Sequence, residues 1–140
     1  MLLSDRQPAD PRQPARNRLV SDLVSRRGSR EERLSLARAV GFDPQKPFSL
    51  LVLRGEEPGG HRALLISASA ATGESSLVGA HDGDVVALVP GTDADGLARA
   101  VAARIGKRTC VTVAGAGPVR DVDGIAEAHE EAHRTVGALI

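Results

Sequence analysis

The chain has 140 residues, of which 41% are apolar, and this length and composition suit one globular domain with a buried core. Nine arginines stand against five acids in residues 1–40, and nine basic residues against thirteen acids in residues 41–140, so the body is mildly acidic and poorly suited to bind a DNA backbone. With only two phenylalanines, Phe42 and Phe48, and no tyrosine or tryptophan, the chain also lacks the aromatic platforms on which single-stranded nucleic acid stacks.

Residues 1–15 form the first predicted segment, a disordered arm. This segment is rich in polar residues, and it contains three prolines that oppose a helix: Pro8, Pro11 and Pro14. The basic arm is expected to be a solvated tail, with contact to DNA as the alternative. It has no secretory signal, and no later stretch has the roughly 18 apolar residues of a membrane span, so a cytoplasmic protein is expected. Arginine outnumbers lysine by 16 to 2, which indicates an actinobacterial-like, high-GC composition.

Residues 16–41 predict a pair of helices. The first covers about 15–27 and carries one narrow apolar stripe at helical spacing, formed by Leu19, Val20, Leu23 and Val24. Ser29 and Glu32 fit a capping box at the start of the second helix, which Gly41 ends. Such a pair must lay its stripe on something, and the sequence leaves open whether the domain or a partner subunit covers it.

Residues 42–140 predict an α+β domain with the element order β-α-β-β-α-β-α. The expected elements are a strand at 48–53, a helix at 61–71, strands at 76–80 and 84–89, a helix from 92–95 to 105, a strand at 109–113, a turn at 115–118 and a helix at 123–139. This is the split βαβ order of ferredoxin-like folds, in which helices cover one face of an antiparallel sheet.

A tight hairpin is predicted at His81-Asp82-Gly83-Asp84. An Asp-Gly pair between two β-prone runs is a strong hairpin signal, because both residues tolerate the positive φ that the turn needs. Asp82 and Asp84 flank the tip, where paired carboxylates either bind a divalent ion or remain solvated. Solvation is the expectation here.

Residues 129–133 read HEEAH, the His-Glu-x-x-His pattern in which two imidazoles hold zinc and the glutamate handles the proton of a bound water. A catalytic zinc needs a third protein ligand, and the seven residues after His133 contain none. The proposed fold gives no reason to place His61 or His81 beside the last helix. We therefore interpret His129 as a half-buried residue at the core edge and His133 as a solvated one, with a zinc-dependent hydrolase as the less favoured alternative.

Two further patterns have structural explanations. Cys110 lies in an expected strand without a nearby base or positive dipole, so it is interpreted as a structural thiol; as the only cysteine, it points to a reducing compartment. The segment Gly115-Ala116-Gly117-Pro118 lacks the third glycine of the dinucleotide fingerprint and the Lys-Ser/Thr of a P-loop. A tight turn is the better interpretation.

The stretch HDGDVVALVPG, followed by a helix and by VTVAGAGPVRDVDGIAEAHEEAHRTV, resembles the GGDEF-like central domain of PucR/CdaR-type bacterial transcriptional regulators. That family typically has a Gly-Asp hairpin ending in a Leu/Val-rich strand with Pro-Gly, then a strand, a Gly-rich turn and a helix with spaced Glu-Ala. The segment RLVSDLVSRRGSREERLSLARAVGFDPQKPFSLLVL resembles the family's entry, where a helix ending in Gly-Phe-Asp leads through Pro-Phe into the first strand. The resemblance covers about residues 16–140.

The resemblance implies a nucleotide-cyclase-like fold without cyclase activity. Diguanylate cyclases need a Gly-Gly-Asp-Glu-Phe turn, whose amides approach phosphates and whose carboxylates hold two magnesium ions. Here the turn reads His81-Asp82-Gly83-Asp84-Val85, and an alignment ambiguous by one residue puts either Val85 or Asp84 at the catalytic glutamate. The guanine-recognising elements have no convincing counterpart in GGHRALLISASAATGESS. The family's last helix binds no metal, so the resemblance also marks HEEAH as a coincidence.

The sequence therefore predicts a non-catalytic regulatory or dimerisation domain without catalytic residues, cofactor or metal, and a homodimer is the expected assembly. Such regulators continue into a helix-turn-helix, which does not follow before Ile140. The chain is thus expected to be a truncated relative or part of a longer regulator, and not to recognise DNA alone. The alternative is a small-molecule or nucleotide sensor, in which an open sheet face or the turn at 115–118 holds the effector.

Overall fold

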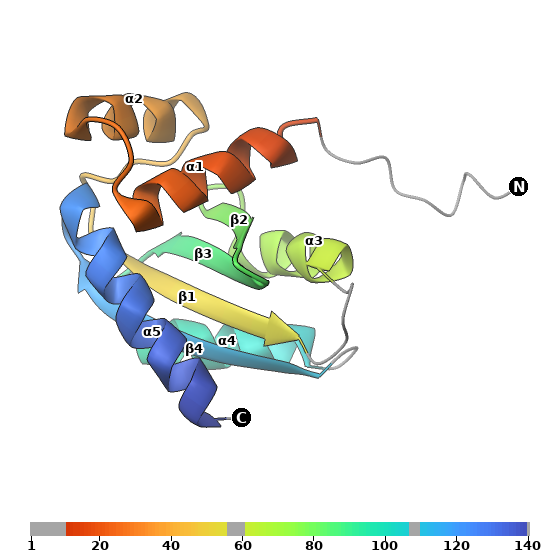
Figure 1. The fold of residues 1–140 in the computed structure, drawn as a ribbon. Coiled ribbons are helices and arrows are strands. Elements are labelled where there is room, and N and C mark those ends of the chain that lie inside the picture. Colours follow the sequence, from red (N-terminus) through yellow and green to blue (C-terminus); the bar gives the residue numbers. More distant parts are fainter. Residues whose placement is uncertain (1–10, 56–60, 107–109, 140) are drawn as a thin grey trace, which may run out of the picture.

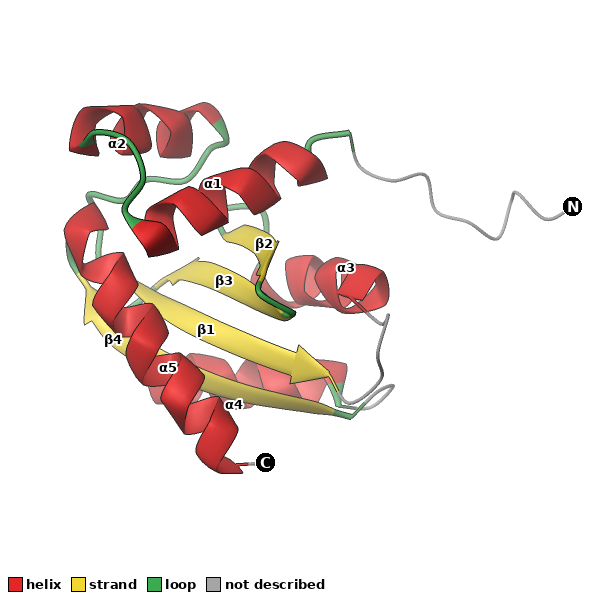
Figure 2. Cartoon of the chain, viewed as in Figure 1, coloured by secondary structure: helices red, strands yellow, loops and turns green. Residues whose placement is uncertain are grey.

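One four-stranded antiparallel sheet is the centre of the computed structural model, which describes residues 11–55, 61–106 and 110–139 (Figure 1). The strands follow the order β2-β3-β1-β4, and their bounds are β1 Phe48–Gly55, β2 Leu77–His81, β3 Asp84–Pro90 and β4 Val111–Val119. Each neighbouring pair is antiparallel. Helices surround this sheet (Figure 2), so the predicted α+β fold is confirmed.

Two helices connect strands that are not neighbours. Helix α3, His61–Thr72, runs from β1 to β2, and β3 lies between these strands. Helix α4, Ala94–Ile105, runs from β3 to β4, and β1 lies between them. These two interleaved βαβ units are the ferredoxin-like arrangement that the element order predicted.

Helices cover both faces of the sheet, which corrects the prediction of one covered face. Helices α3 and α4 pack on one face, while α1, Gln13–Ser25, and α5, Ile125–Leu139, pack on the other (Figure 1). Each face has its own buried apolar cluster, because α1 and α5 carry apolar stripes that also need cover. The described part of the chain therefore has no open sheet face of the kind expected for a bound effector.

The central strand β1 explains the continuous apolar run in the sequence. Its first six residues are buried, with Leu50 and Val52 in the cluster under α1 and α5 and Leu51 in the cluster under α3 and α4. A strand that is buried on both faces is apolar at nearly every position instead of alternating. At its start, the ring of Phe48 packs edge-on against Phe42 with 5.1 Å between the centroids.

Strand β4 is longer than predicted, because the segment 115–118 continues the strand instead of turning. Gly115 lies opposite Leu51 of β1. A Cβ atom at Gly115 would lie 2.7 Å from the carbonyl oxygen of Ala94 at the start of α4, so glycine allows helix and strand to approach closely. The predicted turn at 115–118 is wrong, and this glycine serves packing.

Three other boundaries differ from the prediction by a few residues. Cys110 precedes β4 and is exposed, so it is not part of the strand expected for it. Helix α1 begins at Gln13, because Pro14 lies in its first turn, where a missing N–H is harmless. The rest of the predicted arm, residues 1–10, lies outside the described residues. Helix α5 begins only after a 3₁₀ turn at Val122–Gly124.

The domain itself covers the apolar stripe of α1. Leu19, Val20 and Leu23 are each less than 5% exposed and belong to the same buried cluster as the inner face of α5. This answers the question that the sequence left open, since α1 packs on the sheet and not on a partner subunit. The division of the chain at residue 42 stays a sequence prediction. Among the described helices, none is long and apolar enough to cross a membrane.

Helix α2, Arg30–Ala39, lies farther from the sheet than α1 (Figure 1). Its predicted cap is confirmed, because the Ser29 hydroxyl accepts a hydrogen bond from the amide of Glu32 at 3.1 Å. Only Arg33 and Ala37 of this helix are buried. The helix is therefore held mainly by its first turn and by one face.

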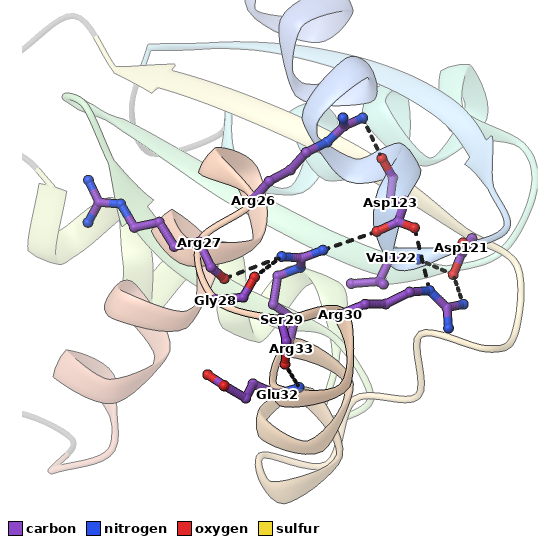
Figure 3. Close-up of polar contacts among 10 residues, drawn as sticks. All are labelled: Arg26, Arg27, Gly28, Ser29, Arg30, Glu32, Arg33, Asp121, Val122 and Asp123. Atoms are coloured by element: carbon purple, nitrogen blue, oxygen red, sulfur yellow. Dashed lines mark hydrogen bonds and ion pairs between the residues drawn. The ribbon is translucent and has the colours of Figure 1, made fainter.

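An arginine clasp fixes that first turn to the start of α5 (Figure 3); we define it as Arg26, Arg30, Arg33, Asp121 and Asp123. Arg33 is 6% exposed and donates to the carbonyl of Gly28 at 2.7 Å and to Asp123 Oδ1 at 3.1 Å. Arg30 pairs with Asp121 at 2.7 Å, and this hydrogen bond lowers the pKa of the Asp121 carboxyl. The N-terminal helices are thus anchored to the body by charge as well as by apolar contact.

Candidate functional site

The β2–β3 hairpin carries the residues predicted as a degenerate site. His81 pairs with Asp84 across the turn. Asp82 and Gly83 form the turn with φ values of 46° and 85°, the left-handed conformations that a two-residue hairpin of this kind requires. The predicted hairpin is confirmed in its turn residues and in both strands.

Asp84 is buried and fully engaged with Arg54 of β1. The register pairs Leu53 with Val85, which brings Arg54 beside Asp84. Arg54 Nε donates to Asp84 Oδ1 at 2.8 Å and Nη2 donates to Oδ2 at 3.0 Å, a bidentate ion pair. The hydrogen bond to Asp84 raises the pKa of the Arg54 guanidinium, so Arg54 stays charged. Solvation, the expectation for both hairpin carboxylates, therefore fails for this one.

Asp82 has the opposite environment. Its side chain is 85% exposed, and its oxygen Oδ2 lies 3.4 Å from His81 Nε2. The expected solvated carboxylate is found at this position. The two acids of the hairpin thus differ in exposure and in partner, and they do not act as one paired site.

Three histidines pack together beside this hairpin, and we call His81, His129 and His133 the histidine trio. The rings of His81 and His129 meet edge to face with 5.2 Å between centroids, and His129 stacks on His133 at 5.7 Å. No feature of the sequence placed His81 next to α5, and the structure corrects this expectation. The cause is tertiary, since α5 crosses the sheet face on which His81 projects from β2.

Two members of the histidine trio have polar neighbours outside it. The hydroxyl of Ser21 on α1 lies 2.9 Å from Nδ1 of His81. Nδ1 of His133 lies 3.5 Å from Asp84 Oδ2 and 3.4 Å from Arg54 Nη2. His129 is half-buried between the other two rings, as predicted, and His133 is exposed but in contact with the ion pair.

Burial lowers the pKa of the His129 imidazole below its ordinary value, and the neighbouring His81 and His133 lower it further. The carboxylates of Asp84 and Asp82 act in the opposite direction but do not outweigh these effects. His129 is therefore held in its neutral form more strongly than a histidine in water.

A metal is not favoured at this cluster. Within the described ranges, no group of three or more His, Cys, Asp or Glu side chains is arranged to hold an ion. The guanidinium of Arg54, 3.4 Å from His133 Nδ1, would also repel a cation. The HEEAH imidazoles are instead in contact with His81, Asp84 and Arg54.

Sequence reasoning missed Arg54 and Ser21 entirely. One weak signal was available for Arg54, because an arginine closes the apolar run of β1 just as Asp84 opens the apolar run of β3. Charged residues at matching ends of buried neighbouring strands are candidates for a pair. Ser21 offered no such signal, since its partner His81 is 60 residues away in the chain.

A second concave region lies between β4 and α5. This hollow of about 560 Å³ is lined by Gly117, Pro118, Arg120, Glu127, Glu131 and Arg134, among others. Both charge signs are present, so the hollow would suit a polar molecule better than an apolar one. It adjoins the glycine-containing segment that the sequence suggested as an effector site.

Comparison with known proteins gives one family and one informative structure. Residues 25–138 match the GGDEF-like domain family. The fold is also similar to the crystal structure of a regulator of polyketide synthase expression from Bifidobacterium adolescentis, with a TM-score of 0.58 and 14% sequence identity. The aligned region covers 91% of this chain and 53% of that regulator, so the chain spans about half of its length. No curated protein matches the chain significantly.

Proposed function

The chain belongs to the GGDEF-like domain family, and from this membership we propose that it is a non-catalytic regulatory domain of the PucR/CdaR type. The observation that carries the proposal is the engagement of Asp84. In a diguanylate cyclase the carboxylates of the corresponding turn are free to hold magnesium. Here that carboxylate is 4% exposed and both its oxygens accept hydrogen bonds from Arg54.

The position of the turn supports the same proposal. The sequence left Asp84 and Val85 as the two alternatives for the catalytic glutamate, and both follow the bend at Asp82-Gly83. Val85 of β3 is fully buried in the apolar cluster that faces α3 and α4. Its side chain has no group that binds a metal or a phosphate. Under either alternative, the position of the catalytic glutamate holds no free carboxylate, since Asp84 is paired with Arg54.

A regulatory role agrees with the structural relative, which is a regulator of polyketide synthase expression. PucR/CdaR-type regulators bind DNA through a separate helix-turn-helix, so the proposal assigns no operator recognition to the residues of this chain. Its contribution would be to associate with a second copy and to hold the rest of the regulator in position.

An apolar groove between α1 and α2 is the surface that we propose for this association. The groove has a volume of about 630 Å³, and its lining includes Pro14, Ala15, Leu36 and Val40. Leu36 lines this groove and is 50% exposed, so association there would remove an apolar side chain from water. Arg18 and Asp22 lie one helical turn apart on the same wall of the groove. Across a two-fold axis, Arg18 of one protomer would pair with Asp22 of its partner.

Light scattering coupled to size exclusion tests the proposal at high micromolar protein concentration. The native chain is expected to elute with the mass of a dimer, and Leu36→Glu is expected to shift it to a monomer. Ile66→Glu is the matched control, because Ile66 of α3 is 45% exposed but lies outside the groove. A native chain that is a strict monomer at this concentration would contradict the association.

A sensor for a small polar molecule is the second candidate, and the hollow between β4 and α5 favours it. Arg120 and Arg134 would bind an anionic group there, beside the backbone of Gly117. A thermal-shift screen with nucleotides and purine metabolites separates this candidate from a pure association domain. A shift that Arg134→Ala removes would support the sensor, and the lack of any shift would count against it.

A further inference from the structure

Five elements of the fold meet at the histidine trio. His81 comes from β2 and the other two histidines from α5, while Ser21 of α1 and the Arg54–Asp84 pair of the two central strands complete the contact. His81 has only 11% of its side chain exposed. The three rings therefore lie where α1 and α5 both meet the hairpin.

We infer that the histidine trio makes this seating responsive to protons, so that α1 and α5 are held firmly on the β2–β3 hairpin at neutral pH and loosen in mildly acidic solution. The trio is compatible with close packing only while its rings are mostly neutral. Two imidazolium rings at 5.2 Å and 5.7 Å from a third would place like charges together in a partly buried site.

The charged groups around the trio do not remove this repulsion. Asp84, from β3, lies 3.5 Å from His133 Nδ1, but both its oxygens already accept hydrogen bonds from the positively charged Arg54 of β1. Asp82, at the turn, is 85% exposed and is screened by water. Strand β4 has no charged residue, α1 contributes the neutral hydroxyl of Ser21, and Glu130 of α5 is exposed.

The direction of the pH effect follows from His129. Its folded-state pKa lies below the ordinary value of about 6.5, so the unfolded chain takes up a proton first as the pH falls. The stabilisation is complete above about pH 6.5 and decreases as the pH falls from there toward the lowered pKa. Ser21 does not oppose the change, because its hydroxyl donates to a bare Nδ1 of His81 and accepts from a protonated one.

Proton NMR of the imidazole Cε1–H signals of the native chain is the direct test. His129 is expected to titrate below the ordinary range, and His81→Asn is expected to shift that titration to higher pH by removing one positive neighbour. A His129 signal that titrates at or above the ordinary value would overturn the inference, and this measurement needs no variant to fold.

Urea unfolding between pH 8 and pH 5 tests the consequence for stability. For the native chain, the urea concentration at the unfolding midpoint is expected to decrease as the pH drops below about 6.5. His129→Gln is expected to weaken this pH dependence. Glu130→Gln, a substitution at the neighbouring exposed position, is expected to leave the pH dependence unchanged. Hydrogen exchange should then increase in α1 and in the hairpin at pH 5.5, relative to pH 7.5, while α4 remains protected. Equal pH profiles for the native chain and His129→Gln, or exchange that increases uniformly over the sheet, would overturn it.

Discussion

The pair of Asp84 and Arg54 determines what the hairpin does at the scale of single residues. A buried carboxylate without a partner is costly, and the guanidinium satisfies both of its oxygens. The same bonds that stabilise the fold also remove the carboxylate from any role in holding a metal. The ion pair with Arg54 therefore explains both the stability of the hairpin and its lack of a metal-binding carboxylate.

Removing the guanidinium tests this cause. Arg54→Ala is expected to lower the free energy of unfolding by about 2–3 kcal/mol, less than for a fully buried pair because Arg54 is 30% exposed. Urea denaturation measures it, with Arg99→Ala on the exposed face of α4 as the control. In the double variant Arg54→Met/Asp84→Leu, most of the stability should return, because neither charge is left alone. A change below about 0.5 kcal/mol for Arg54→Ala would contradict a structural role for the pair.

Single residues also mark the limit of prediction from sequence. The turn at Asp82-Gly83 was predictable because it depends on the φ preferences of two neighbouring residues. The burial of Asp84 and the contact of His81 with His129 were not, since both depend on which elements the fold brings side by side. His129 was correctly placed at the core edge because helical spacing alone decides that.

At the scale of elements, β4 illustrates how tertiary packing overrides local signals. Its glycines and proline predict a turn, but pairing with β1 over Val111–Val119 keeps the segment extended. Gly115 is required because α4 begins directly above it. The order of strands and helices was predictable from apolar periodicity, whereas the end of this strand was not.

Gly115→Ala tests that packing. The new Cβ would lie 2.7 Å from the carbonyl oxygen of Ala94 and 3.0 Å from Leu51 Cδ2, so a loss of about 1–3 kcal/mol of stability is expected. Gly137→Ala is the matched control, because nothing lies within 4 Å of the added methyl group and the position is helical. It should stabilise the protein by up to about 1 kcal/mol. Equal effects of the two substitutions in thermal unfolding would refute the close approach of α4.

At the scale of the whole molecule, the sheet is a middle layer with a separate apolar core on each side. The ferredoxin-like topology was predictable, but the second covered face was not, because the sequence left open what α1 covers. In the structure α1 completes the core above Leu50 and Val52, and the arginine clasp holds α2 in place. The N-terminal helices are thus part of the folded body.

Truncation tests this integration. A chain that begins at Gly28 lacks α1 and exposes the sheet face that Leu19, Val20 and Leu23 cover. We expect it to lose cooperative thermal unfolding and to bind the dye ANS, as a protein with an uncovered apolar core does. The control removes residues 1–10 alone, which the sequence predicts to belong to a solvated arm, and the melting curve should then stay unchanged. A truncated chain with a native-like, cooperative transition would contradict the role of α1 in the core.

The most direct test of the central claim is incubation of the purified chain with GTP and Mg²⁺, followed by chromatography of the nucleotides. Because the hairpin carboxylate is committed to Arg54 and its neighbour is a buried valine, GTP is expected to be recovered unchanged, and calorimetry should detect no Mg²⁺-dependent binding. Release of pyrophosphate with formation of a cyclic dinucleotide, abolished by Asp84→Asn, would contradict it.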